Sequence, residues 1–164
     1  MNEFVIQYRE KNDNDDDWIK KVATEQWGSD EIISKDHLYK VEALPGFIAE
    51  QNNKPIGVIL YAIEEKECEI VALYSSFEKQ GIGSRLIELV CEIAKITKCQ
   101  RVWLQTTNDN TTALRFYQKR GFVIAAIRTN VIEAQRKVKE IPFFGNDGIP
   151  IRDEIELELI IKLE

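Results

Sequence analysis

The chain has few of the side chains that most often hold metal ions. It contains one histidine, His37, and three cysteines without metal-ligand spacing, so we expect no metal site. Cys68 and Cys91 fall in a predicted strand and a predicted helix, where a free cysteine is usually packed in the interior. His37 has no visible partner in the polar segment around it. We therefore interpret these side chains as structural.

Long apolar runs and an excess of positive charge are also missing. No run approaches the length that spans a bilayer, and residues 1–4 lack the charged and apolar regions of a signal peptide. The 22 basic side chains are outnumbered by 28 acidic ones, and no basic cluster lies on one predicted face. This excludes a general nucleic-acid or membrane-surface binder and favours a cytoplasmic protein. A cationic acceptor and a homodimer both stay open.

The residues that are present suffice for one folded domain over residues 1–164. Hydrophobic residues make up 44% of the chain and aromatic residues 9%. Apolar spacing and turn residues predict a meander of strands, followed by helices that alternate with strands. The predicted strands are 4–8, 46–50, 56–63, 68–74, 101–107, 122–127 and 155–163, and the predicted helices are 18–27, 34–41, 82–96, 110–121 and 131–138. Residues 29–33 are expected to form a loop.

The strand, glycine turn and helix of residues 67–96 carry the first functional signal. The turn is Gln80, Gly81, Ile82, Gly83 and Ser84. At a helix start the first backbone N–H groups lack intrahelical partners and the helix dipole adds positive charge, which suits a phosphate. The turn lacks the lysine of a Walker loop and the third glycine of a Rossmann fingerprint. Taken alone, it is also compatible with a tight turn that serves packing.

Two spaced motifs give this turn a more specific meaning. Residues 78–83, Glu-Lys-Gln-Gly-Ile-Gly, resemble the pyrophosphate loop Gln/Arg-x-x-Gly-x-Gly/Ala of the GNAT superfamily of acyl-CoA-dependent N-acetyltransferases, with Glu78 departing from the pattern. Residues 110–122 resemble the second signature, Asn-x-x-Ala-x-x-x-Tyr followed by Gly-Phe. The resemblance implies an α/β fold: a mixed, mainly antiparallel twisted sheet of about seven strands, flanked by about four helices, with a central parallel strand pair.

The resemblance also implies a transferase that moves an acetyl group from acetyl-CoA directly to a primary amine of a small-molecule or peptide acceptor. Tyr117 would be the general acid that protonates the departing CoA sulfur. The residues implied to bind the cofactor are Leu73, Tyr74, Lys79, Gln80, Gly81, Ile82, Gly83, Ser84, Asn110, Ala113 and Phe116. From the residues alone, Tyr117 also fits a core aromatic, and Asn110 also fits the N-cap of its helix.

Two glutamates are candidates for the general base. Glu67 and Glu69 are two positions apart in a predicted strand, so they are expected to share one face with Val71 and Leu73. Glu67 lies where several members of the family keep a catalytic glutamate, and we rank it slightly ahead. Glu69 lies deeper in the strand, where burial would raise its pKa towards useful values. A merely charged hairpin end is the competing interpretation.

The acceptor site is less defined. In the family, segments corresponding to residues 27–44 and 128–153 line the acceptor pocket, so the long second segment is expected to influence selectivity. A solvated connection or a dimer contact explains it equally well. Two other functions also stay open: a CoA-binding sensor or scaffold module that has lost turnover, and transfer of a longer acyl group.

Overall fold

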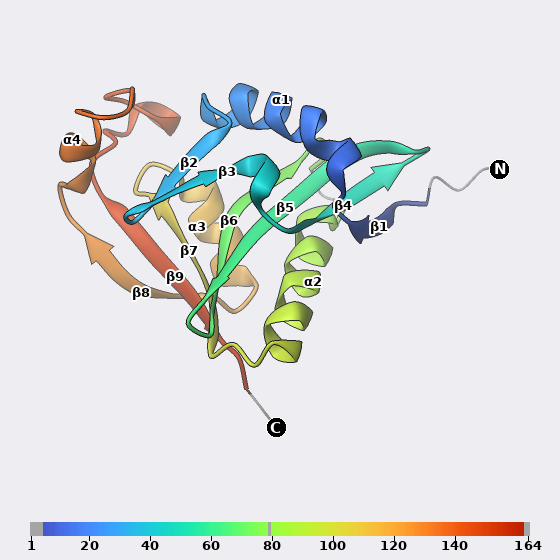
Figure 1. Ribbon diagram of the computed structural model, residues 1–164. Coiled ribbons are helices and arrows are strands. Elements are labelled where there is room, and N and C mark those ends of the chain that lie inside the picture. Colours follow the sequence, from blue (N-terminus) through green and yellow to red (C-terminus); the bar gives the residue numbers. More distant parts are fainter. Residues whose placement is uncertain (1–4, 79, 163–164) are drawn as a thin grey trace. The chain divides into compact units, whose positions relative to one another are not determined.

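The computed structural model describes residues 5–78 and 80–162, which form two compact units. The second unit is Arg101–Ile160, and the first contains the described residues on either side of it. The strands of the first unit are ordered β1-β4-β5-β6 and pair antiparallel. They are β1 (Gln7–Glu10), β4 (Gly46–Gln51), β5 (Lys54–Glu64) and β6 (Glu67–Ser75). Helix α1 (Asp16–Trp27) lies over one face of this sheet and α2 (Ile82–Ile96) over the other (Figure 1).

Both helices form where apolar residues recur at helical spacing. In α1 the buried residues are Ile19, Val22 and Ala23, and the helix ends at Gly28, whose φ of 79° is the left-handed conformation that glycine tolerates. In α2 the buried residues are Ile82, Leu86, Ile87, Val90 and Ala94. The buried face of α1 joins the sheet in a core of Ile19, Ala23, Val41, Leu44, Ile48, Val58, Leu60 and Ala72. The predicted helices 18–27 and 82–96 are thus confirmed.

The helix predicted at residues 34–41 is wrong. This segment, with the preceding residues, forms an antiparallel hairpin of β2 (Glu31–Ser34) and β3 (His37–Lys40), followed by the short 3-10 turn η2 (Val41–Ala43). The side chains alternate as a strand requires: Ile32 and Tyr39 pack against the core, whereas Ile33 and Leu38 are exposed. The true period is therefore two residues, and the predicted loop at 29–33 contains most of the first strand.

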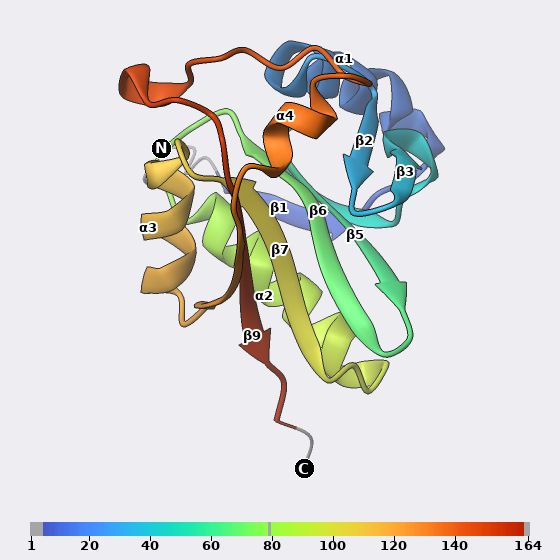
Figure 2. The ribbon, with the colours of Figure 1, turned by 90° about the vertical axis from the view of Figure 1, so that its left-hand side faces the viewer.

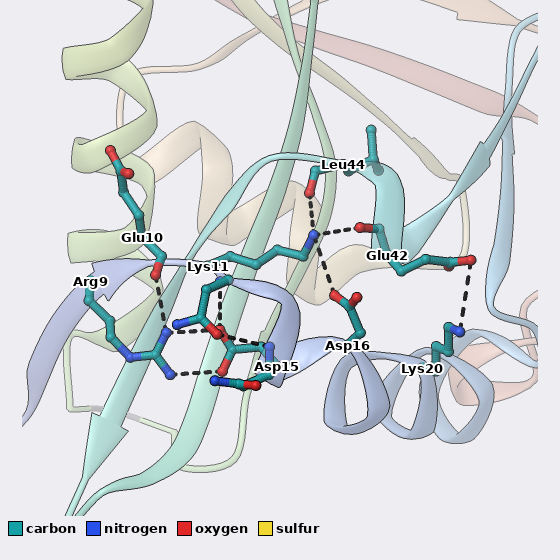
Figure 3. Close-up of polar contacts among 10 residues, drawn as sticks. Arg9, Glu10, Lys11, Asp15, Asp16, Lys20, Glu42 and Leu44 are labelled. Atoms are coloured by element: carbon teal, nitrogen blue, oxygen red, sulfur yellow. Dashed lines mark hydrogen bonds and ion pairs between the residues drawn. The ribbon is translucent and has the colours of Figure 1, made fainter.

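A polar network anchors the segment that follows this hairpin (Figure 3). The ammonium group of Lys11 donates to the backbone carbonyl oxygens of Glu42 and Leu44, each at 2.7 Å, and lies 3.8 Å from Asp16 at the start of α1. Because only 9% of the Lys11 side chain is exposed, these contacts replace its hydration. Lys11 thus joins α1 to the segment after β3.

The second unit is a smaller antiparallel sheet with two helices. Its strands are ordered β7-β9-β8, and β7 and β9 run side by side (Figure 2). They are β7 (Arg101–Thr107), β8 (Val123–Arg128) and β9 (Glu154–Ile160), and the helices are α3 (Thr111–Lys119) and α4 (Val131–Gln135). The helix predicted at 131–138 is shorter than expected and ends at Gln135.

The described strands and helices agree with the predicted α/β class. The two units together contribute seven main strands, and four α-helices are described. The strands expected to form a parallel pair, β6 and β7, are the last strand of the first unit and the first strand of the second. In the part of the chain that the structure describes, none of the helices has the length and apolar character needed to cross a membrane.

The ion pair of Arg9 and Asp15 gives the first prediction. Arg9 donates to both carboxylate oxygens of Asp15 at 2.8 and 2.7 Å, and these hydrogen bonds hold the pKa of Asp15 below its ordinary value. The contribution to stability is therefore complete above the unfolded-state pKa of about 3.9 and is lost as the pH falls through the folded-state pKa. Asp15→Asn should lower the free energy of unfolding by about 2 kcal/mol at pH 7.

Urea unfolding at several pH values measures this effect. The difference between wild type and Asp15→Asn should shrink as the pH falls below about 4, because Asp15 is protonated first in the unfolded chain and only at lower pH in the folded one. Asp17→Asn is the matched control, because Asp17 belongs to the same acidic run but is exposed. Equal losses in the two variants at pH 7 would contradict the assignment of a stabilising role to this ion pair.

Candidate active site

The start of α2 presents backbone N–H groups without a side-chain cap. Gly81 is the N-cap residue, adopts a left-handed φ of 72° and makes no capping hydrogen bond, and the first turn contains no acidic residue. Ile82 is buried beside Gly57, where an added Cβ would lie 2.9 Å from the Ile82 Cγ2 atom. The helix start is therefore fixed by packing, whereas its dipole and its first N–H groups favour an anion.

The neighbouring side chains of the turn are largely exposed. Glu78 and Gln80 are exposed, Gly83 and Ser84 are half-buried, and the predicted ligand Lys79 lies outside the described residues. The guanidinium group of Arg85 contacts Glu88 at 3.1 Å and Glu92 at 3.5 Å. Arg85 is thus engaged along its own helix.

A β-bulge changes the expected orientation of side chains in β6. Ala72 pairs with Leu60 and Ile70 with Tyr61, so Val71 has no opposite residue on β5. The inserted residue reverses which side chains of β6 point to each face of the sheet. The prediction that Leu73 shares a face with Glu67 and Glu69 is therefore wrong. Tyr74 instead lies on the α1 side, with its ring centroid 6.3 Å from that of Trp18. A bulge interrupts the hydrogen-bond ladder at this point, close to Leu73.

Glu69 is a buried carboxylate held by the hairpin β2–β3. Only 5% of Glu69 is exposed. The Ser34 hydroxyl donates a short hydrogen bond to Oε1, and the Tyr39 hydroxyl donates to Oε2 at 3.3 Å. Burial raises the pKa of Glu69, while the two hydroxyl donors oppose that rise. Burial and the neighbouring Glu69 raise the pKa of Tyr39 to about 12, so its phenol stays protonated and can donate.

Glu67 has a different environment. It is half-buried and lies at the end of the β5–β6 hairpin, beside the turn of Glu65 and Lys66. In the strand register it is opposite Glu64. His37, which had no partner visible in the sequence, lies with its Nε2 atom 3.1 Å from Glu64 and stacks on Tyr39. Within the first unit, Glu69 is thus the more buried of the two predicted bases.

The sequence analysis did not identify Ser34 and Tyr39. Both lie in the segment 34–41 that the sequence predicts as a helix, and a helical spacing does not place them on one face. The signal that identifies them is the alternation of residues 31–34 and 37–40 around the turn at Lys35 and Asp36, which puts Ile32, Ser34, His37 and Tyr39 on the same side of a hairpin.

In the second unit, α3 carries the residues of the second motif. The Asn110 side chain accepts a hydrogen bond from the Ala113 N–H at 3.1 Å, so the predicted N-cap is confirmed. Tyr117 is 7% exposed and packs edge-on between Phe116 and Phe122, with ring centroids 5.2 and 5.4 Å away. Burial raises the pKa of Tyr117, so its phenol is protonated at neutral pH but is a weaker acid than that of an exposed tyrosine. Its role as an acid stays a prediction.

The connection of residues 129–153 is anchored to the end of β7. Asn108 Oδ1 accepts from the backbone N–H groups of Arg152 and Asp153 at 3.0 Å, and Asp109 Oδ2 accepts from Asn146 N at 3.1 Å. Gly145 is required beside this contact, because an added Cβ would lie 2.0 Å from Asp109 Oδ2. The connection therefore has a defined conformation, although Phe143 and Phe144, also part of it, are strongly exposed.

All three cysteines belong to the first unit. Cys68 and Cys99 are buried, and all three cysteines are free. Burial raises the pKa of Cys68 to about 12 and that of Cys91 to about 11, so both remain thiols at neutral pH. Across residues 5–78 and 80–162, no group of three or more His, Cys, Asp or Glu side chains is arranged to hold a metal ion.

Comparison with known proteins relates this geometry to a family. Residues 11–122 match the model of the Acetyltransferase (GNAT) family. The Bacillus subtilis (strain 168) protein YdhI, which is uncharacterised, is 44% identical over 137 residues, covering 82% of this chain and 86% of YdhI. Streptothricin acetyltransferase A of the same organism is 30% identical over 76 residues, covering 46% of this chain and 44% of that protein.

A solved structure gives the same result for the fold. A GNAT family acetyltransferase from Elizabethkingia anophelis with acetyl-CoA bound aligns with a TM-score of 0.67 at 23% identity, covering 94% of this chain and 97% of that one. This similarity confirms the predicted fold class. The family model and the identity to YdhI extend over most of the chain. The chain therefore belongs to the GNAT acetyltransferase family.

Proposed function

We propose that this protein is an N-acetyltransferase that moves an acetyl group from acetyl-CoA directly to a primary amine. Family membership supports acyl transfer, and the observation that carries the cosubstrate assignment is the start of α2. There the N-cap residue is a glycine, which makes no side-chain cap hydrogen bond, and the first turn contains no acidic residue. These features fit a pyrophosphate, and Gly81 and Gly83 permit its close approach.

The proposal gives roles to the turn at the start of α2, to helix α3 with its N-cap, and to strand β6. The backbone of residues 81–84 holds the pyrophosphate, and Asn110, Ala113 and Phe116 of α3 contribute to cofactor binding. Bound acetyl-CoA supplies an activated acetyl group as a thioester. Tyr117, whose phenol carries its proton at neutral pH, supplies that proton to the departing CoA sulfur. Leu73 lies close to the interruption of the β6 ladder, and a backbone N–H near it holds the acetyl carbonyl.

Glu69 is the preferred base for the acceptor amine. An amine attacks only after losing its proton, and a carboxylate with a raised pKa accepts that proton more readily than an ordinary one. Burial gives Glu69 this property, whereas Glu67 lies beside an exposed turn. We therefore reverse the order that the sequence alone favoured.

Acceptor selectivity is assigned to the segment of residues 128–153, which contains the connection of residues 129–153, and to the segment of residues 27–44. The relative that acetylates streptothricin makes this antibiotic a reasonable first acceptor, and a polyamine and a peptide with a free α-amino group extend the panel. These three amines differ in charge and size, so relative turnover over the panel reports on the acceptor site.

Thermal shift and thiol release test the proposed function together. Acetyl-CoA should raise the melting temperature, because a ligand that binds only the folded chain stabilises it. Addition of an accepted amine should then release free CoA. Tyr117→Phe should retain the thermal shift but lower kcat by about 100-fold, because the proton donor is lost.

The other outcomes separate the rival functions. Without a thermal shift the cosubstrate assignment is wrong. A shift without thiol release over the whole panel indicates a binding module, and a larger shift with a longer acyl-CoA, accompanied by its turnover, indicates a different donor. Unchanged kcat in Tyr117→Phe removes the proposed acid.

The anchored connection gives a separate prediction. In Gly145→Ala the added methyl group collides with Asp109, so the local structure should be destabilised by about 2 kcal/mol. The connection should become more sensitive to limited proteolysis, and relative turnover over the amine panel should change while the acetyl-CoA thermal shift is retained.

Asn146→Ala is the matched control for Gly145→Ala. Asn146 is exposed and uses only its backbone N–H to contact Asp109, so this variant preserves the anchor. If Gly145→Ala loosens the connection yet leaves the acceptor preference unchanged, the connection has no part in selectivity.

A further inference from the structure

We infer that the hairpin β2–β3 supplies two positioning residues, Ser34 and Tyr39, which hold the Glu69 carboxylate in place to receive the proton of the acceptor amine. The inference rests on the proposed function, in which Glu69 takes this proton. The two hydroxyl groups act through Glu69 and do not themselves react. The hairpin thus positions the base in addition to covering the sheet.

The first support is that both carboxylate oxygens are held, and from different strands. Ser34 at the end of β2 donates to Oε1, and Tyr39 in β3 donates to Oε2 at 3.3 Å. The last torsion of a glutamate side chain is otherwise broad, so a single donor would leave the carboxylate free to rotate. Two donors on opposite sides of the hairpin turn fix its plane. Each oxygen still has a lone pair for an incoming N–H group.

The second support is the chemical nature of the donors. Both are neutral hydroxyl groups, so they orient the carboxylate without cancelling its negative charge. The hairpin also carries Lys35 and His37, and both lower the pKa of Glu69 electrostatically, by less than the two hydroxyl donors do. The Nε2 atom of His37 lies 3.1 Å from Glu64. On β6 itself the next side chain, Cys68, is a neutral thiol. Neither hydroxyl donor neutralises the carboxylate, so its charge can attract an ammonium group.

The third support is the balance of burial and hydrogen bonding. Burial makes Glu69 more basic, whereas the hydrogen bonds to its ionised form oppose that rise. In the reaction the N–H bond of the ammonium group breaks, its proton forms an O–H bond with Glu69, and the electron pair stays on nitrogen for attack. A base suited to this step has a pKa between that of an exposed carboxylate and the working pH.

Carboxyl NMR measures the first consequence without any acceptor. In protein with 13C-labelled glutamate carboxyl groups, the Glu69 signal is assigned by its loss in Glu69→Gln and titrated with pH. Ser34→Ala and Tyr39→Phe should each raise the pKa of Glu69 by about one unit, because a donor to the ionised form is removed. Ser34→Thr, which keeps the hydroxyl, should restore the wild-type value.

Activity measures the second consequence. With the best amine of the panel, the acid limb of the kcat/KM profile should move to higher pH by the same amount as the NMR pKa in each variant. Tyr61→Phe is the matched control: it removes a half-buried phenol of β5 that stacks on Phe47, and both readouts should stay at wild type.

Two results overturn the inference. An unchanged Glu69 pKa in both Ser34→Ala and Tyr39→Phe shows that the hydroxyl groups do not control the carboxylate. A raised NMR pKa with an unmoved acid limb shows that their role is structural only. Failure of the proposed function itself is recognised separately, because wild type would then show neither an acetyl-CoA thermal shift nor thiol release.

Discussion

The hairpin β2–β3 and strand β6 meet at one buried carboxylate, that of Glu69. A carboxylate at 5% exposure is costly unless donors surround it, and here the donors Ser34 and Tyr39 come from both strands of the hairpin β2–β3. The hairpin must therefore lie against β6. Packing of its inner face on the core and the contacts of Lys11 with the following segment keep it there. The hydrogen bonds of Ser34 and Tyr39 to Glu69 thus serve both the stability of the hairpin and the proposed chemistry.

The second unit combines a structural and a proposed catalytic role in one turn. Asn108 and Asp109 anchor the connection of residues 129–153, and the next residue, Asn110, caps the helix that carries Tyr117. The turn after β7 therefore fixes the candidate acceptor segment and the helix of the candidate acid at once. A change in this turn should disturb both.

The sequence predicted most elements because their signals are local. The helical spacing of α1 and α2, the Asn110 cap and the turn between β4 and β5 each lie within a few residues. The hairpin β2–β3 was missed because its strands are short and its turn uses Lys35 in a left-handed conformation, without the glycine that usually marks it. The bulge at Val71 inserts a residue without any compositional mark. Ser34 and Glu69 are 35 positions apart, so their contact depends on the tertiary fold.

The central claim is that the buried Glu69, rather than the neighbouring Glu67, removes the proton from the acceptor amine. The most direct measurement compares the pH dependence of kcat/KM in Glu69→Gln and Glu67→Gln with the amine that wild type acetylates fastest. We predict that Glu69→Gln loses about 100-fold in rate at neutral pH together with the acid limb of the profile, while Glu67→Gln keeps both. A wild-type profile in Glu69→Gln would contradict the account.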